Sequence, residues 1–400
     1  MSRISLCILV KNEGYLLEKC LKTIKGEVEE IIVVNNGSID NTKQIAESYG
    51  SIVIDLPNSS LDNARQAYLE AATQPWILVL DADEMLYPKD IIEIKKILLD
   101  TRHNVMGYRL PRYEYIGKGK WASIDILRLT RNDPRIKYTS SKIHATLSTS
   151  INDIEGEMEK INSTPIHHFD ILYKNKTSRK RDKYIQHLKE ELIHNSRNNP
   201  HLISYLGVEY FALGNYEKAE ALFLNAIKTD KLNLSKGRLY LAQLYFHLRK
   251  YIQAESQANL VLKEGSPFLQ DRCYTLLADI YVAQKNFNKA IEHSESALNI
   301  DRFGAHNYIN MASLLQNTAP KLSIQYSLKA IDLNPMLLNH TIYDMGEKPN
   351  IFEFQSSFIS SSGSVFDILI KCFSKLNRQN DKEYWVEKKI AIERKIHSVI

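Results

Sequence analysis

The N-terminal part of the sequence alternates short apolar runs with segments of helical periodicity. Ile4 to Val10 and Ile31 to Val34 have the length and composition of buried strands, and Leu16 to Ile24 between them places its apolar residues at helical spacing. A second helical segment, Thr42 to Tyr49, follows, and another apolar run begins at Trp76. Short buried strands that alternate with helices are typical of a parallel α/β sheet. We therefore predict an α/β domain of the Rossmann-like kind.

The third apolar run ends in acids. The segment WILVLDADEM, Trp76 to Met85, contains two aspartates one residue apart, Asp81 and Asp83. Because side chains alternate along an extended strand, two carboxylates at this spacing can point the same way. Carboxylates suit hard cations such as Mg²⁺ and Mn²⁺, and a cation held there can neutralise a diphosphate leaving group. A strand that ends in solvated acids is the alternative for this motif taken alone.

The other predicted strands also end in polar residues, and ligands of α/β sheets bind beyond the carboxyl ends of strands. Together these segments resemble the family 2 glycosyltransferases of the glycosyltransferase A fold. The matching pieces, across about residues 3 to 172, are CILVKNEGYLLEKCLKTI, EIIVVNNGSIDNTKQIA, DNARQAYLEAATQPWILVLDADE and LRLTRND…KIHATL. The resemblance implies transfer of a sugar from a nucleotide donor, normally with inversion at the anomeric carbon. The residues that it implies are a nucleoside pocket at Asn12, Glu13, Asn35 and Asn36, a phosphate contact at Arg65, and metal–diphosphate contacts at Asp81 and Asp83.

The sequence departs from the family's pattern at two positions. Asn35 stands where the family usually has Asp, and an amide donates as well as accepts hydrogen bonds, so the base of the sugar nucleotide stays open. Ala145 stands where relatives often carry Glu beside the histidine of the motif, here His144. We expect His144 to be a catalytic residue and a metal ligand together with Asp83. The groups that can replace the missing base are Asp125, His144, His168 and Asp170.

From about residue 200 the sequence is helical throughout and repeats. The successive segments are YLGVEYFALGNYEKAEALFLNAI, YLAQLYFHLRKYIQAESQANLVL, TLLADIYVAQKNFNKAIEHSESAL and a degenerate INMASLLQNTAPKLSIQYSLKAIDLNP. Small residues recur at Ala219, Ala254 and Ala290, at spacings of 35 and 36, and leucines and tyrosines keep the same register. This pattern resembles tetratricopeptide repeats, whose period is about 34 residues. Such solenoids bind peptides or partner proteins; bracing of the catalytic domain and formation of a homodimer are the alternatives.

We divide the chain accordingly. The predicted parts are a glycosyltransferase catalytic domain (1–172), a basic linker helix (173–198), tetratricopeptide repeats (199–335) and C-terminal capping helices (336–400). The linker contains the run KNKTSRKRDKYIQHLK, which we expect to form a solvated helix face; an approach of its basic residues to the donor diphosphate is the alternative. Trp121, in the acceptor-side segment, either packs or stacks on a sugar, and packing is favoured.

The amino-acid composition limits the classes of protein to which the chain can belong. The 400 residues are 44% hydrophobic, enough for ordinary cores. A net charge of +5 is small for this length and does not indicate a nucleic-acid-binding protein. The four cysteines form no C-x-x-C pair, which fits buried thiols in a reducing compartment. We find no signal peptide and no apolar stretch of membrane-spanning length, and we expect a cytoplasmic enzyme.

The leading hypothesis is a metal-dependent inverting glycosyltransferase of the hexosyltransferase type that uses a nucleotide-sugar, preferably a UDP-sugar. Its acceptor is expected to be a peptide, modified at Cys or Ser, as in the similar S-glycosyltransferases of glycosylated bacteriocins. A thiol ionises near pH ~8.5 and needs less base catalysis than a hydroxyl, which would tolerate Ala145. The alternatives are a glycosyltransferase of lipopolysaccharide-core or surface-glycan assembly and a non-catalytic repeat scaffold with a decayed transferase domain.

Overall fold

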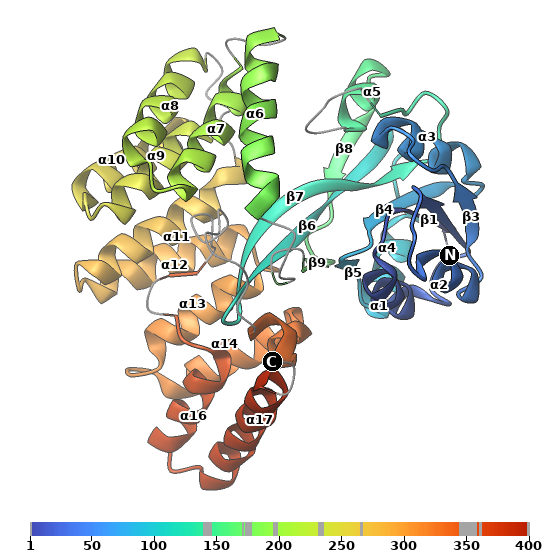
Figure 1. The fold of residues 1–400 in the computed structure, drawn as a ribbon. Helices are drawn as coiled ribbons and strands as arrows, with labels where there is room; N and C mark the ends of the chain where they lie inside the picture. The colour runs from blue at the N-terminus through green and yellow to red at the C-terminus, as the bar shows by residue number, and fades with distance from the viewer. Residues whose placement is uncertain are drawn as a thin grey trace. The chain divides into compact units, whose positions relative to one another are not determined.

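The structure, a computed structural model, describes residues 2–138, 146–169, 172, 178–194, 199–230, 236–264, 267–343, 358–359 and 362–397. By its internal contacts the chain separates into two units (Figure 1). The first comprises Met1–Glu114 and Ser123–Asp170, and the second comprises Tyr115–Ala122 and Ile171–Ile400.

Among the described residues, the first unit is built on one sheet of nine strands. These are β1 (Ile4–Val10), β2 (Glu30–Asn35), β3 (Ile52–Asp55), β4 (Trp76–Asp81), β5 (Glu84–Met85), β6 (Val105–Gly117), β7 (Lys120–Arg131), β8 (Glu157–Lys160) and β9 (Ile166–His168). The order is β3-β2-β1-β4-β7-β6-β9-β5, with β8 paired to β6. β1 is parallel to β2 and β4, as predicted, whereas β4 and β7 are antiparallel. The sheet is therefore mixed rather than wholly parallel.

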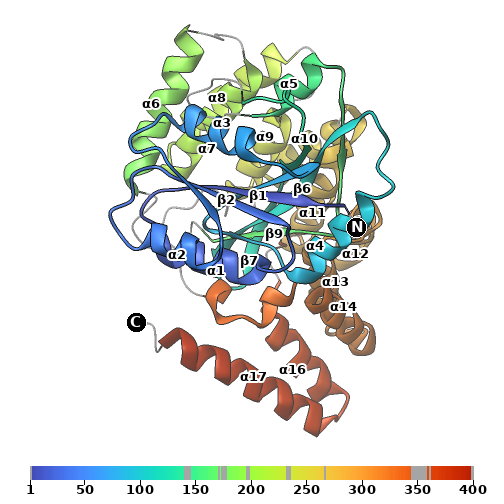
Figure 2. The same cartoon turned by 90° about the vertical axis from the view of Figure 1, so that its right-hand side faces the viewer.

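Helices cover both faces of the sheet, because alternate residues of the central strands are apolar on both sides. Ile4, Leu6 and Ile8 share a core with α1 (Gly14–Ile24), α2 (Thr42–Ser48) and α4 (Pro88–Ile97). Cys7 faces the other way, into a core that includes α3 (Leu61–Ala71) and α5 (Ser148–Asp153). Figure 2 shows α3 and α1 on opposite sides of β1 and β2. This three-layer arrangement explains why the strands are continuous apolar runs.

The second unit is helical. After α6 (Ser178–His194), its repeat helices are α7 (Pro200–Ala212), α8 (Tyr216–Thr229), α9 (Gly237–His247), α10 (Tyr251–Glu264), α11 (Pro267–Ala283), α12 (Phe287–Ile300), α13 (Ala305–Leu315) and α14 (Pro320–Leu333). The short helices η2 (Pro335–Leu338) and η3 (His340–Tyr343) follow, then α16 (Val365–Lys375) and α17 (Gln379–His397). The helical repeat region that the sequence predicted is thus present.

The repeated residues have the roles that their register indicates. The alanines of the second helix of each pair, Ala219, Ala254 and Ala290, are fully buried. The tyrosines link successive repeats through their hydroxyls, since Tyr245 donates to Glu220 at 2.8 Å and Tyr281 donates to Glu255 at 2.7 Å. The small residues therefore allow close helix packing, and the larger ones tie neighbouring repeats together.

The tip of the β6–β7 hairpin belongs to the second unit. Trp121 is fully buried there, with its ring edge-on to Phe358 at a centroid distance of 4.6 Å. The Tyr115 hydroxyl donates to Asn334 Oδ1 at 3.1 Å, and the amide of Gly119 donates to the carbonyl of Ile342 at 3.0 Å. Trp121 thus packs, as favoured from the sequence, and it is not available for stacking on a sugar.

The four cysteines are buried free thiols, as predicted. Burial raises the pKa of Cys7 and Cys20 well above the ordinary value. Within the described residues, none of the helices combines the length and the apolar character needed to cross a bilayer.

Candidate active site

The carboxyl ends of β1 and β2 form one side of the site. The amide of Asn12 donates to Ser38 Oγ at 2.9 Å, and the amide of Ser38 donates to Asn35 Oδ1 at 3.0 Å. Asn12 has a positive φ of 55°, a conformation that Asn tolerates better than most residues. Two of the residues expected in the nucleoside pocket are therefore brought together through Ser38. Glu13, the next residue, donates from its amide to Thr42 Oγ1 at 3.1 Å.

Asn35 has a physical reason to differ from the family's usual Asp. Its Nδ2 donates to Asp55 Oδ1 at 2.8 Å, and Lys43 lies 2.6 Å from the other oxygen of Asp55. These two hydrogen bonds hold the pKa of Asp55 below its ordinary value. An aspartate at position 35 would place two carboxylates in contact, so the amide follows from the acid on the neighbouring strand.

Asn36, the residue after Asn35, is buried, and only one of the two polar atoms of its side chain is hydrogen-bonded to a described residue. Its Nδ2 donates to the carbonyl of Ser59 at 3.1 Å, while its Oδ1 is buried and has no hydrogen-bond partner among the described residues. Buried polar atoms are normally paired. Asn36 Oδ1 is thus an unused acceptor at the strand end where the sequence predicted a nucleoside.

The two aspartates of the D-x-D motif do not lie together on one extended strand. β4 ends at Asp81, and Ala82 and Asp83 form a turn before β5. The expectation of parallel carboxylates on a single strand is therefore wrong, because the alternation rule stops where the strand stops. The Asp81 side chain is 45% exposed and that of Asp83 is 7% exposed.

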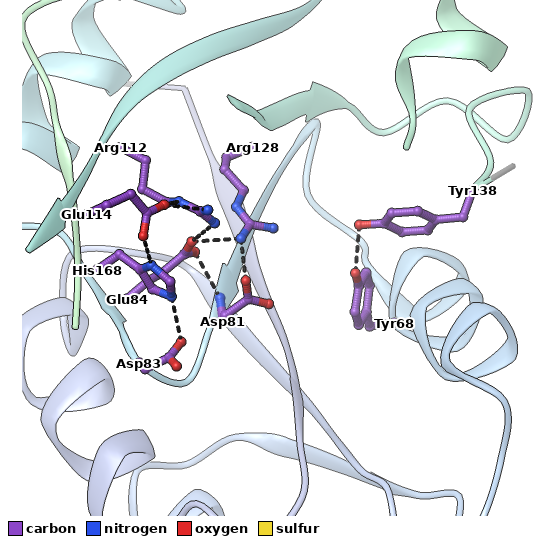
Figure 3. Close-up of polar contacts among 9 residues, drawn as sticks. All are labelled: Tyr68, Asp81, Asp83, Glu84, Arg112, Glu114, Arg128, Tyr138 and His168. Carbon is purple, nitrogen blue, oxygen red and sulfur yellow. Dashed lines mark hydrogen bonds and ion pairs between the residues drawn. The ribbon is translucent and has the colours of Figure 1, made fainter. Parts of the chain in front are cut away.

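A continuous series of ion pairs nevertheless connects the two aspartates (Figure 3). Acids and bases alternate along it, and in order its members are Asp81, Arg128, Glu84, Arg112, Glu114, His168 and Asp83. We call these seven residues the ion-pair chain. It contains four carboxylates and three cationic groups, so one negative charge remains in excess.

Glu84 lies at the centre of the ion-pair chain and is completely buried. Its Oε1 accepts from Arg128 at 2.7 Å and from Arg112 at 2.9 Å, and its Oε2 accepts from the amide of Asp81 at 3.0 Å. A buried carboxylate is stable only when it is paired and hydrogen-bonded. Glu84 therefore fixes both arginines and the main chain at the end of β4.

The strand order brings the remaining members together. β9 lies between β6 and β5, with His168 opposite Glu114 on one side and opposite Glu84 on the other. Arg112 is two residues before Glu114 on β6 and therefore points to the same face. Residues from three strands, far apart in the sequence, thus meet in one row.

The charges of the ion-pair chain shift the pKa values of its members. Burial works against ionisation of Asp81, but Arg128 outweighs it and holds the pKa of Asp81 below its ordinary value. Burial acts likewise on Glu114, whose pKa is held low by His168 and Arg112. Burial would lower the pKa of His168, yet the carboxylate of Glu114 outweighs it and raises the pKa to about 10. At neutral pH the carboxylates of Asp81 and Glu114 are therefore ionised, and the imidazole of His168 is protonated.

Arg65, the predicted phosphate contact, lies on α3 and contacts Tyr138. Its guanidinium is over the ring of Tyr138, 5.7 Å from the centroid. The Tyr138 hydroxyl shares a 2.7 Å hydrogen bond with that of Tyr68 (Figure 3). Burial raises the pKa of Tyr138, while Arg128 and Arg65 both act to lower it. Tyr138 thus lies within electrostatic reach of both arginines.

The candidate bases lie in different places. Asp125 is on β7, three residues before Arg128, so an undistorted strand puts it on the opposite face. Its Oδ2 is paired with Lys160 at 2.9 Å. His168 is committed to two carboxylates. His144, Ala145 and Asp170 lie outside the described residues, so their roles stay predictions.

Sequence reasoning missed three members of the ion-pair chain as site residues, Glu84, Arg112 and Glu114, and placed Arg128 only in the acceptor-side segment. Arg112 and Glu114 are charged residues two positions apart within an otherwise largely apolar strand, and Glu84 belongs to the D-A-D-E segment. These signals mark residues that need partners. They do not identify the partners, because the strand order is not sequential.

Comparison with known proteins finds similarity in both halves of the chain. The family model of glycosyl transferase family 2 matches residues 5–155, and the tetratricopeptide-repeat model matches residues 206–231 and 271–303. The TPR repeat-containing protein Synpcc7942_0270 of Synechococcus elongatus is 34% identical over 139 residues, 34% of this chain and 34% of that protein. The lipopolysaccharide core biosynthesis glycosyltransferase LpsC of Rhizobium meliloti is 27% identical over 191 residues, 45% of this chain and 68% of that protein.

A solved structure also shows similarity. Glucosyl-3-phosphoglycerate synthase of Mycobacterium tuberculosis, in complex with Mn²⁺, UDP-glucose and glycerol 3-phosphate, is 22% identical, with a TM-score of 0.25 over 28% of this chain and 44% of that chain. The present chain spans about a third of the length of the Synechococcus protein, since 34% of that protein is covered. Residues 5–155 are accordingly a domain of glycosyl transferase family 2, and tetratricopeptide repeats follow it in the same chain.

Proposed function

We propose that the chain is a nucleotide-sugar-dependent glycosyltransferase that works with a divalent cation. The observation that carries the proposal is the ion-pair chain, which ends in Asp81 and Asp83 and retains one excess negative charge. Its open end is at Asp81, where Oδ2 is paired with Arg128 and Oδ1 has no hydrogen-bond partner among the described residues. The half-exposed carboxylate of Asp81, in a surrounding with a net negative charge, fits a hard cation.

Mg²⁺ or Mn²⁺ are the cations that fit this set of ligands, since both prefer carboxylate oxygens. Asp81 and Asp83 would hold the ion, and when bound it supplies Lewis-acid neutralisation of the leaving diphosphate. His144 is proposed as a further ligand and a catalytic residue on its sequence motif alone. Arg65 is proposed to contact the donor phosphates.

The nucleoside is proposed to lie against the ends of β1 and β2. Asn12 and Asn35 are joined through Ser38 at this place, and Asn36 offers its unused buried oxygen. The Asn36 oxygen can accept a hydrogen bond from an N–H group of a nucleotide base. Uracil carries such an N–H, in line with the UDP-sugar expected from the sequence. Glu13 is proposed to line the same pocket.

The acceptor is proposed to be a peptide or protein, reached through the repeats and modified at Cys or Ser. The support is the tetratricopeptide-repeat region, an architecture suited to peptides. Formation of a homodimer through these repeats stays the alternative. A second candidate function is assembly of lipopolysaccharide core or another surface glycan, which the similarity to LpsC favours. A decayed domain is disfavoured, because decay would not maintain a continuous series of seven mutually paired charges, three of them on fully or almost fully buried carboxylates.

The test is donor hydrolysis and transfer by the full chain across UDP-, GDP- and ADP-sugars, each with Mn²⁺, Mg²⁺ or excess EDTA. We expect turnover of one class of donor that requires the cation. Full activity in EDTA would remove the cation from the proposal. The absence of binding and of turnover for every donor would favour the scaffold.

A further inference from the structure

We infer that Glu114 and His168 are a positioning pair for Asp83, holding its carboxylate in the orientation in which it meets the divalent cation. The inference rests on the proposed cation-dependent function and assigns a role to two residues outside the D-x-D motif. Neither of them is argued to contact the donor.

Both nitrogens of the His168 ring are engaged. Nδ1 is bonded to Glu114 Oε2, and Nε2 lies 3.4 Å from Asp83 Oδ1. The two contacts lie on opposite sides of the imidazole, so together they determine the rotation of the ring. Figure 3 shows His168 between the two carboxylates. The orientation of His168, and with it that of Asp83, therefore depends on Glu114.

Glu114 is itself held rigidly. Its side chain is 1% exposed, and its Oε1 accepts from Arg112, which in turn pairs with the buried Glu84 at 2.9 Å. Long side chains lose considerable rotamer freedom when they are fixed in this way. The loss is already present in the folded chain, so Asp83 is oriented before any cation binds.

A main-chain hydrogen bond from the residue that follows β9 also fixes the turn that contains Asp83. The amide of Phe169, the residue after His168, donates to the carbonyl of Asp83 at 3.2 Å. Both the backbone and the carboxylate of Asp83 thus depend on the place of β9 between β6 and β5.

The two aspartates of the motif differ in how firmly they are held. Asp81 is 45% exposed, with one oxygen paired to Arg128, whereas Asp83 is 7% exposed and lies against His168. Carboxylate–histidine contacts behind a metal site orient its ligands, and their loss typically lowers metal affinity about 10–100-fold. Asp83 is accordingly the preorganised ligand and Asp81 the accessible one.

The test uses the full chain with His168→Gln and Glu114→Gln. Lys95→Met is the matched control, because it removes a partly buried ion pair of the same unit, Lys95–Glu29 at 2.7 Å. Binding of Mn²⁺ alone is measured by electron paramagnetic resonance of the free ion. Thermal unfolding and donor hydrolysis at increasing Mn²⁺ are measured in parallel.

We expect the Kd for Mn²⁺ to rise about 10–100-fold in both site variants and to stay unchanged in Lys95→Met, whatever the change in Tm. Saturating Mn²⁺ should largely restore the maximal rate, since the cation ligands remain.

If the unaltered chain binds Mn²⁺ and the folded site variants bind it equally well, the positioning role is overturned while the proposed function stands. If the unaltered chain neither binds Mn²⁺ nor turns over a donor, the proposed function fails and the inference fails with it. His168→Asn is the second variant should His168→Gln not fold, and the same outcomes apply to it.

Discussion

His167 and His168 are neighbours on β9, and the pKa values of their imidazoles move in opposite directions. His168 lies in the ion-pair chain, and its pKa is raised to about 10. His167 points to the other face of the strand, edge-on to Tyr87 at a centroid distance of 5.2 Å. Burial, with a smaller contribution from Lys89, lowers the pKa of His167 to about 3. Because adjacent residues of a strand point to opposite faces, the protonated ring of His168 and the neutral ring of His167 lie in different surroundings.

These shifts predict opposite effects of pH on stability. For His168 the folded-state pKa lies above the ordinary 6.5, so its contribution is complete below pH ~6.5 and is lost as pH rises toward about 10. For His167 the folded-state pKa lies below 6.5, so its contribution is complete above pH ~6.5 and is lost as pH falls toward about 3.

Urea unfolding across pH checks this prediction. His168→Gln should flatten the alkaline side of the stability profile, and His167→Phe should flatten the acid side. The exposed His201, on α7, provides the control His201→Gln, which should leave both sides unchanged. A His168 variant that retains the full alkaline loss would contradict the assigned protonation.

The next prediction concerns the motif itself. Asp83→Ala should lower transfer about 100-fold or more, because one lost charge-stabilising contact costs roughly 3 kcal/mol of barrier. Steady-state kinetics with the preferred donor measure the effect. Lys95→Met, outside the site, is expected to retain the rate. Equal rates for Asp83→Ala and the unaltered chain would exclude Asp83 from the reaction.

The Asn35–Asp55 hydrogen bond predicts a suppressor. Asn35→Asp should destabilise the fold by about 0.5–1.5 kcal/mol at pH 7, since it replaces a partly buried hydrogen bond with two opposed carboxylates. The double variant Asn35→Asp/Asp55→Asn restores one donor and one acceptor and should recover most of the loss. Denaturant unfolding decides between these outcomes; a double variant no more stable than Asn35→Asp would show that the pair is not the cause.

The hairpin tip predicts that the first unit is not separable at the predicted linker. Truncation after residue 195 removes the second-unit residues around Trp121, among them Phe358. We expect the truncated protein to aggregate. In the full chain Trp121→Ala should cost about 3–5 kcal/mol, whereas Lys118→Asn, at an exposed position with a φ of 54° that suits Asn, should cost little.

The acceptor proposal predicts a preference between two peptides. A pair that differs only in Cys or Ser at the modified position should react faster with Cys, and the difference should grow as pH rises toward the thiol pKa of ~8.5. Transfer assays with the preferred donor measure the two rates. Equal rates, or transfer to a glycolipid alone, would reject the thiol acceptor.

The sequence by itself determined the local elements and their kind. β1 has the predicted bounds, Ile4–Val10, α1 and α2 lie where helical spacing predicted them, and the repeat alanines are buried as their register required. Each of these follows from residues a few positions apart, whose periodicity shows which face is apolar. The family resemblance, carried by contiguous motifs, was confirmed for the same reason.

Only the tertiary structure decided how the chemistry is assembled. The side chain of Asp83 is in contact with His168, which is bonded to Glu114, and the ring of Trp121 packs against Phe358. These partners are too far apart in the sequence for any periodic pattern to reveal them. The physical reason is the strand order: β9 pairs with β6 and β5 rather than with its sequence neighbour β8. A pattern along the chain indicates that a buried charge needs a partner, and only the fold determines which residue that partner is.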